Sequence, residues 1–151
     1  MKNIRTISIA LAFLTSLIIA PLSHAEDSPV GTWKNIDDKT GKPRGIIVIT
    51  EVNGEFIGKI EKIFPEPNEE QNPKCVKCEG ANKDKPVIGM TILYGLKKEG
   101  DEYTGGKILD PDNGVVYSCK LTVIDQNKKL KVRGFIGVPF LGRSQIWSRE
   151  K

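Results

Sequence analysis

Residues 102–124 read EYTGGKILDPDNGVVYSCKLTVI, and this stretch sets the pattern for the rest of the chain. Two segments rich in β-branched and aromatic residues, Glu102–Leu109 and Val115–Ile124, flank a cluster of turn formers. In the second segment apolar and polar residues alternate, as in a strand with one buried face. The turn around Asn113 and Gly114 tolerates tight or left-handed backbone geometry. The stretch therefore predicts a β-hairpin with the Cys119 side chain directed inward.

The same pattern recurs along the chain. Short β-branched and aromatic segments are separated by turn clusters, and no convincing helical period runs for a dozen residues in the part that follows the N-terminal segment. We predict eight strands, at Val30–Ile36, Gly45–Val52, Glu55–Phe64, Ile88–Leu96, Glu102–Leu109, Val115–Ile124, Lys129–Val138 and Arg143–Arg149.

Strands joined by short turns form an antiparallel meander, and the meander must hide its two edges. Closure into an up-and-down barrel removes the edges, and eight strands leave an interior that is either filled by side chains or holds one small ligand. The predicted fold class is therefore all-β, an eight-stranded antiparallel up-and-down barrel. A β-sandwich is the alternative.

The N-terminal segment has the pattern of a signal peptide. Lys2 and Arg5 precede an apolar run from Ile7 to Ala20, and Ser23-His24-Ala25 offers small residues before a cleavage point. We expect residues 1–25 to be removed, residues 26–151 to form a single barrel domain without a transmembrane segment, and the protein to be exported, either periplasmic or secreted. An uncleaved anchor is the alternative, although the run is shorter than the roughly 20 residues that cross a bilayer.

The chemistry open to the mature chain is restricted by its lack of histidine. His24 is the only histidine of the sequence, so Ser-His-Asp catalysis, Cys-His catalysis and imidazole metal sites are excluded after cleavage. We predict no metal, no cofactor and no enzymatic activity, with an enzyme that uses tyrosine and carboxylates as the alternative. Of 23 basic residues Lys2 and Arg5 are removed, which leaves 21 against 19 acidic ones. This balance does not indicate nucleic-acid binding.

One connection, residues 65–87, is long, polar and rich in proline, as functional or disordered loops often are. It contains Cys75 and Cys78. A redox motif would need a helix start in a βαβ unit, and a zinc site would need four ligands. In an oxidising compartment a structural disulfide is favoured, so we predict a Cys75–Cys78 bridge and a free, buried Cys119. A Cys78–Cys119 bridge is the alternative.

Residues near the two ends of the mature chain resemble the lipocalin pattern. Gly31-Thr32-Trp33 lies on the first predicted strand, and residues 142–149 close the chain with two arginines. In lipocalins a Gly-x-Trp tryptophan closes one end of the barrel, and an arginine of the last strand lies across its ring. The resemblance implies that Trp33 is the plug and that either Arg143 or Arg149 is its partner.

A second resemblance covers nearly the whole mature chain. It is to the bacterial exported family known as domain of unknown function 2147, which has no agreed activity. The resemblance implies a lipocalin-like barrel outside the cytoplasm. The matching stretches are Val30–Lys34, Gly105–Pro111, Gly114–Cys119, Leu130–Gly137 and Leu141–Trp147.

Large aromatic and polar side chains stand along the central and late strands, where a solid core would more often use Leu, Ile or Val. They are the candidate ligand-binding residues: Tyr94, Tyr103, Tyr117, Arg133, Gln145 and Trp147. Lys131, Arg133 and Phe135 share one face of their strand, and Val132, Gly134 and Ile136 share the other. If the face of Lys131, Arg133 and Phe135 is outside, Arg133 is a surface charge. If that face is inside, Arg133 binds the polar or anionic end of the ligand.

Two functions follow from this pattern. The first is a lipocalin-like binding protein for a small, largely apolar or amphiphilic ligand with a polar or anionic end. The second is a structural or interaction protein of the envelope or secretome, with a solid core, that contacts a protein partner through residues 65–87.

The expected signal peptide leads to the first testable prediction. When the full chain is expressed in a bacterium, we expect the exported species to begin at Glu26, because Ala25 ends the cleavage pattern. Intact-mass measurement and N-terminal sequencing of the extracytoplasmic fraction check this. A full-length species retained in the cytoplasm or membrane would contradict it.

Overall fold

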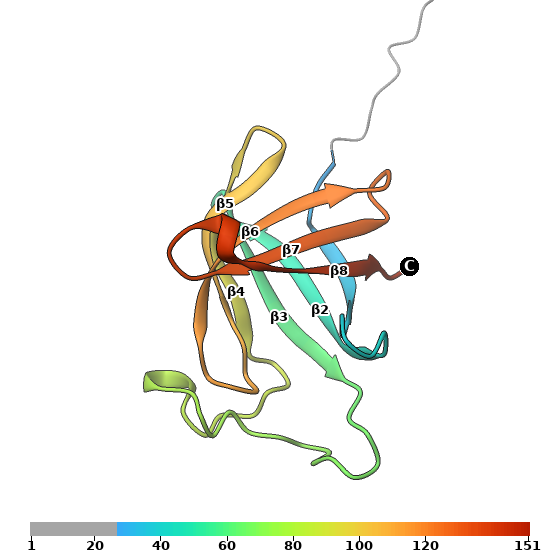
Figure 1. Ribbon diagram of the computed structural model, residues 1–151, viewed down its shortest axis with the longest axis vertical. Coiled ribbons are helices and arrows are strands. Elements are labelled where there is room, and N and C mark those ends of the chain that lie inside the picture. The colour runs from blue at the N-terminus through green and yellow to red at the C-terminus, as the bar shows by residue number, and fades with distance from the viewer. Residues whose placement is uncertain (1–26) are drawn as a thin grey trace, which may run out of the picture.

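The computed structural model describes residues 27–151, which form a closed antiparallel barrel with strand order β1 to β8 (Figure 1). The predicted signal peptide lies outside the described residues. Two short 3₁₀ turns, η1 (Gly80–Asn82) and η2 (Pro139–Leu141), accompany the strands. The strands are β1 (Gly31–Ile36), β2 (Pro43–Val52), β3 (Glu55–Ile63), β4 (Thr91–Glu99), β5 (Glu102–Leu109), β6 (Val116–Ile124), β7 (Lys129–Phe135) and β8 (Arg143–Arg149).

Closure depends on β1, which pairs with β2 on one side and with β8 on the other. Trp33 stands at this seam, opposite Ile47 of β2 and Arg149 of β8. All eight strands therefore belong to one continuous sheet without a free edge. The predicted all-β barrel is confirmed, and the alternative sandwich is wrong.

Several strand ends differ from the predicted ones: β4 ends at Glu99 rather than Leu96, β2 begins at Pro43 rather than Gly45, and β1, β3 and β6 differ by one residue at one end. Glycines explain the two other three-residue differences. β4 begins at Thr91 rather than Ile88, because Gly89 has a positive φ of 85° and turns the chain before the strand starts. β7 ends at Phe135 rather than Val138, because Gly137 has a positive φ of 75°. Between Gly137 and β8 the chain forms η2 instead of continuing the ladder.

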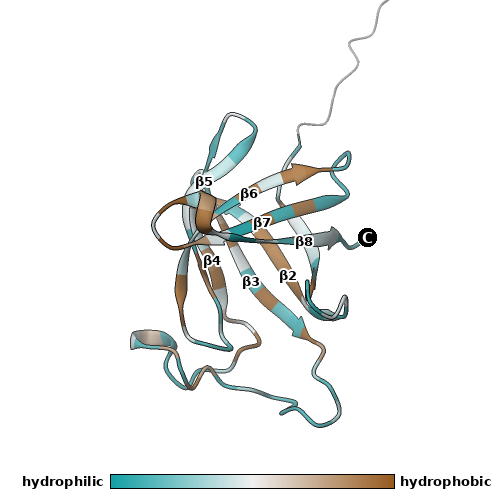
Figure 2. Ribbon diagram, in the orientation of Figure 1, coloured by the Kyte–Doolittle hydropathy of each residue, from teal (hydrophilic) through white to brown (hydrophobic). Residues whose placement is uncertain are grey.

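The apolar core follows the two-residue alternation of the strands. On β6 the buried residues are Cys119 and Leu121, and on β7 they are Leu130 and Val132. These positions fix the inner face of both strands, and Figure 2 shows the apolar bands along the ribbon. The core is completed mainly by large aliphatic and aromatic side chains, among them Trp33, Ile47, Ile49, Phe56, Ile60, Leu93, Leu96 and Trp147.

One end of the barrel is closed by Trp33 and Arg149. The Trp33 ring is fully buried, and its Nε1–H donates a hydrogen bond of 2.7 Å to the Pro29 carbonyl oxygen. The Arg149 guanidinium carbon lies 4.1 Å from the Trp33 ring centroid, a cation–π contact. Its N–H groups donate to the backbone oxygens of Ser28, Val30 and Asn127 and to Asn127 Oδ1.

Gly31 makes this stacking possible. A Cβ at this position would overlap Nη1 of Arg149, and the backbone has a φ of 139°, which L side chains rarely adopt. Of the two arginines implied by the lipocalin resemblance, Arg149 is therefore the stacking partner. Arg143 stands at the other end of β8, where it pairs with Asp38.

The long β3–β4 connection is fastened to the opposite end of the barrel. A disulfide joins Cys75 to Cys78, as predicted, and both half-cystines belong to the buried core together with Val87 and Met90. The loop also meets the β5–β6 turn, because a Cβ on Gly114 would overlap the carbonyl of Lys77. Among the three cysteines, all in the described part of the chain, Cys119 is free and buried.

The Trp33 plug generates a stability prediction. Trp33→Ala removes a fully buried indole and the surface on which Arg149 stacks, so we expect the free energy of unfolding to fall by about 3–5 kcal/mol. Urea titration followed by circular dichroism measures it. Val52→Ala, at a half-exposed position, is the control and should change stability by no more than about 0.5 kcal/mol. A Trp33→Ala protein as stable as the control would contradict the plug.

The buried thiol generates a second prediction. Burial raises the pKa of Cys119 to about 12, and the thiolate is the species that reacts. Without reductant, the folded protein should therefore resist iodoacetamide at mildly alkaline pH and take up one label only after unfolding in guanidinium chloride. Mass spectrometry counts the labels. Equal labelling rates of the folded and unfolded protein would show that the thiol is accessible.

Candidate functional site

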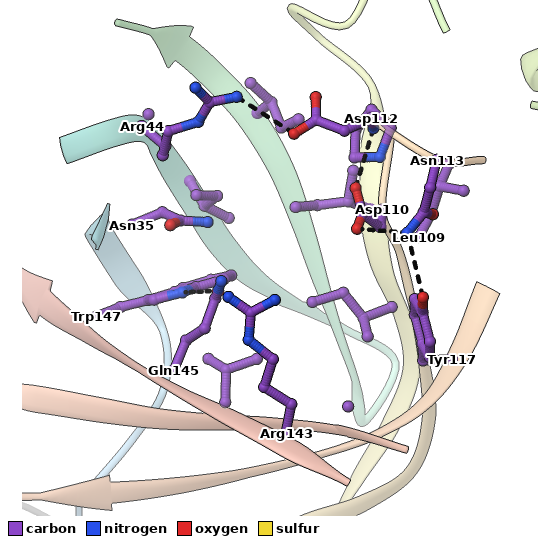
Figure 3. A pocket seen from close by; sticks show the side chains of 18 of the residues that line it. Asn35, Arg44, Leu109, Asp110, Asp112, Asn113, Tyr117, Arg143, Gln145 and Trp147 are labelled. Atoms are coloured by element: carbon purple, nitrogen blue, oxygen red, sulfur yellow. Dashed lines mark hydrogen bonds and ion pairs between the residues drawn. The ribbon is translucent and has the colours of Figure 1, made fainter. Parts of the chain in front are cut away.

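A cavity of about 680 Å³ opens at the end of the barrel opposite the Trp33 plug. Figure 3 shows side chains that line it. Its mouth is formed by the β1–β2, β3–β4, β5–β6 and β7–β8 connections, which all lie at this end of the antiparallel sheet. The disulfide-bearing loop packs beside the β5–β6 turn and so helps to build the rim.

The deep part of the cavity is apolar. Its wall consists of inward-facing side chains from β2, β3, β4, β5, β7 and β8: Ile47, Ile60, Ile92, Ile108, Val132 and Trp147. Trp147 is fully buried, and its Nε1–H donates a 3.1 Å hydrogen bond to Gln145 Oε1. The indole nitrogen is thereby satisfied within the wall, and the fully buried ring forms part of the apolar packing behind the cavity.

The β5–β6 turn supplies a polar, well-ordered part of the rim. The Asp110 carboxylate accepts hydrogen bonds of 2.9 Å from the Asp112 backbone N–H and from Asn113 Nδ2. Asn113 Nδ2 also donates to the Tyr117 hydroxyl at 3.2 Å, which fixes the phenol at the edge of the cavity (Figure 3). Within residues 27–151 no three His, Cys, Asp or Glu side chains gather into a metal-binding group, and the turn uses the carboxylate for its own backbone.

Two arginines join the connections around the mouth. Arg44 of β2 lies 3.3 Å from Glu69 Oε1 of the long loop and 3.2 Å from Asp112 Oδ2 of the β5–β6 turn. Arg143 of β8 donates through Nε to Asp38 Oδ2 at 2.8 Å, and through Nη2 to Asp38 Oδ1. Both guanidinium charges are therefore balanced by carboxylates from other connections.

The Arg143–Asp38 pair depends on the ionised carboxylate. Hydrogen bonding from Arg143 lowers the pKa of Asp38 below its ordinary value. The pair is consequently complete at neutral pH and is lost as the pH falls through this lowered pKa. Both side chains are largely solvent-exposed, so water screens the interaction and the pair adds little to global stability.

Asn35 is the polar residue at the cavity whose hydrogen bonding is incomplete. Its Oδ1 atom is buried and has no hydrogen-bond partner among the described residues, although Asn35 lines the cavity. A buried acceptor of this kind costs free energy unless a donor reaches it. Within residues 27–151, Asn35 is therefore a residue of the cavity lining whose buried acceptor the protein leaves unpaired.

Three of the six predicted ligand residues, Tyr117, Gln145 and Trp147, lie together at this cavity. Tyr103 lies elsewhere in the barrel: it is buried, packs edge-on against Phe56 and donates through its hydroxyl to the Asp27 carbonyl oxygen. Asp27 belongs to the segment that precedes β1, at the plugged end. Tyr103 points into the barrel, but it lies near the start of β5, at the plugged end, whereas the mouth is at the other end of this strand.

The other two predicted residues are on the outside. Arg133 does not enter the barrel, because Leu130 and Val132 occupy the inner face of β7 and strand alternation turns Arg133 outward. Tyr94 is partly exposed on the outer face of β4. The two consecutive buried residues Ile92 and Leu93 break the alternation there, and Gly95 adopts a positive φ of 72°.

Several residues of the cavity rim were not predicted as site residues from the sequence. Arg44, Asp110, Asp112 and Asn113 belong to turns or strand ends, where no periodicity distinguishes a rim residue from a solvated one. Asn35 could have been predicted from the sequence. It is two residues from Trp33 and therefore lies on the same, inner face of β1.

Comparisons with known proteins agree with this architecture. The solved structure of protein HP1028 from Helicobacter pylori, described as belonging to the lipocalin family, matches with a TM-score of 0.69 at 17% sequence identity, over 82% of this chain and 84% of that one. At this identity the match shows the fold alone. No curated protein matches the chain. In residues 27–151, no helix is long and apolar enough to span a bilayer. Residues 31–149 match the family described as "Uncharacterized protein conserved in bacteria (DUF2147)".

Proposed function

The chain belongs to the DUF2147 family of bacterial proteins, and from the geometry of its barrel we propose that it is an exported binding protein for one small, mostly apolar ligand with a polar end. The observation that carries this proposal is the cavity of about 680 Å³ with its apolar wall. Small-molecule sites span roughly 300–1,000 Å³ and combine an apolar lining with a few polar groups.

The cavity also bears on the alternative of a solid structural core. Protein interiors are close-packed, and their ordinary voids rarely exceed the size of a water molecule. A volume of about 680 Å³, part of it in the open mouth, exceeds such a packing defect. It supports a barrel built to hold a guest over one whose interior serves only stability.

The polarity of the lining orients the ligand. Its apolar body would lie deep, against Ile47, Ile92 and Trp147, and its polar end would lie toward the mouth near Asn35 and Gln145. A hydroxyl or amide donor would satisfy Asn35 Oδ1, which lacks a partner within residues 27–151. The proposal contains no catalytic step.

An anionic end is accommodated by Arg143 rather than by Arg133. Arg143 lines the mouth, whereas Arg133 lies outside the barrel. Because exposed ion pairs contribute only about 0–1 kcal/mol, a ligand carboxylate can replace Asp38 on Arg143 at small cost. We therefore assign to Arg143 the discrimination between an acid and the corresponding alcohol.

Export completes the proposal. The Cys75–Cys78 disulfide suits an oxidising compartment such as the periplasm or the extracellular space. This agrees with the signal peptide expected at residues 1–25.

The test compares two substitutions at adjacent positions of β7. Val132→Phe places a larger side chain into the cavity, and Lys131→Phe places the same side chain on the outer wall. We expect the parent and Lys131→Phe to bind an environment-sensitive fluorescent fatty acid saturably, and Val132→Phe to bind it at least about tenfold more weakly, or 1.4 kcal/mol. Circular dichroism confirms that both variants are folded.

Arg143→Gln refines the test. It should weaken binding of the fluorescent fatty acid and leave binding of the matching fatty alcohol unchanged. Absence of saturable binding by the parent to either probe, together with no small molecule retained in native mass spectrometry, would overturn the proposed function.

A further inference from the structure

The β7–β8 connection exposes an unusual set of large apolar side chains. Ile136, Val138, Phe140 and Leu141 are 68%, 54%, 87% and 75% exposed. They lie within six consecutive positions, and Figure 2 shows the loop as an apolar projection at one side of the barrel. Single exposed apolar residues are common, but a cluster of this kind marks an interaction surface.

This loop is held in its exposed conformation by Arg133. The guanidinium donates through Nε to the Pro139 carbonyl oxygen at 2.7 Å and through Nη2 to that of Phe140 at 3.1 Å. Nη1 donates to Ser144 Oγ at 2.9 Å. Charge-assisted bonds to two successive carbonyls fix the backbone of η2, and the apolar side chains are thus presented outward by an ordered loop.

The surroundings of the loop are basic. The strands that lead into and out of the loop carry Lys131, Arg133 and Arg143, and Arg143 is paired with Asp38. Beneath Phe140, on the outer wall, a shallow pocket of about 270 Å³ is lined by Lys120, Lys131 and Arg133. The pocket also contains Glu102, which lies 2.8 Å from Lys120. Lys131 and Arg133 therefore leave the pocket with an excess of positive charge.

We propose that residues 136–141 dock the barrel on the surface of an anionic lipid bilayer. Phe140 and Leu141 would enter the interfacial region, where aromatic and aliphatic side chains are stabilised, while Lys131 and Arg133 would face the phosphate layer. A convex apolar tip above a basic wall complements a negatively charged bilayer, whose surface can yield around an inserted side chain. The charge of the wall is the observation that favours lipid over a second copy of this protein.

Docking would also orient the cavity. Ile136 and Leu141 contribute to the lining of the mouth, so a barrel attached through this loop holds its opening near the lipid surface. The attachment itself does not require a ligand. It can therefore be tested separately from the proposed function.

The experiment introduces a fluorescent reporter at the tip. Both natural tryptophans, Trp33 and Trp147, are fully buried, so a change in emission of Phe140→Trp reports on the loop. We expect a blue shift on addition of vesicles that contain phosphatidylglycerol, a smaller effect with pure phosphatidylcholine, and weakening as salt is raised. Val52→Trp, at an exposed position at the plugged end of the barrel, is the control and should show no shift.

Loss of docking is tested in otherwise unlabelled protein. Phe140→Asp and Lys131→Glu should each reduce co-sedimentation with the anionic vesicles at least fivefold, whereas Val132→Phe should sediment like the parent because it alters only the cavity. No blue shift, or equal shifts for Phe140→Trp and Val52→Trp, would overturn the inference. So would a blue shift that appears without vesicles as protein concentration rises, because it would assign the loop to contact between copies.

Discussion

The contact between Trp33 and Arg149 is the interaction on which the rest of the barrel depends. Backbone pairing at the β1–β8 seam is short, with register pairs at Trp33–Arg149 and Lys34–Ser148, whereas β1 follows β2 from Gly31 to Ile36. The Arg149 side chain reinforces this seam by stacking on the indole and by donating to backbone on both sides of it. Without closure there, β1 and β8 would present unpaired edges.

The same plug determines where the cavity can be. Trp33, Phe56 and Tyr103 fill the plugged end of the barrel, and residues 27–30 cover it by accepting hydrogen bonds from Trp33 and Tyr103. Toward the other end the inward side chains that line the cavity are mainly isoleucine and valine, together with Trp147. The difference in side-chain size between the two ends therefore leaves a cavity open on one side.

Sequence reasoning predicted the parts of this fold that are encoded locally. Turn residues and two-residue alternation predicted the eight strands, and the expected oxidising compartment predicted the disulfide between Cys75 and Cys78. Alternation, however, defines two faces without saying which is inside, so the position of Arg133 depended on the burial of Leu130 and Val132 by neighbouring strands. Alternation also carries no information on depth, and Tyr103 was for that reason grouped with residues of the mouth. The ion pairs of Arg44 with Glu69 and Asp112 join segments far apart in the sequence, so no local sequence pattern predicts them.

Each of four arginines, Arg44, Arg133, Arg143 and Arg149, stabilises a different part of the barrel. Arg149 is partly buried, and this burial lowers its pKa, while its guanidinium is held by the cation–π contact and by acceptors at Ser28, Val30 and Asn127. Arg44 and Arg143 make ion pairs in contact with water, where each pair contributes at most about 1 kcal/mol. The rim connections are therefore joined by weaker interactions than the seam. Arg133, on the outer wall, fixes the backbone of the β7–β8 connection, whereas Arg44 and Arg143 hold the β1–β2, β3–β4 and β5–β6 connections through exposed ion pairs.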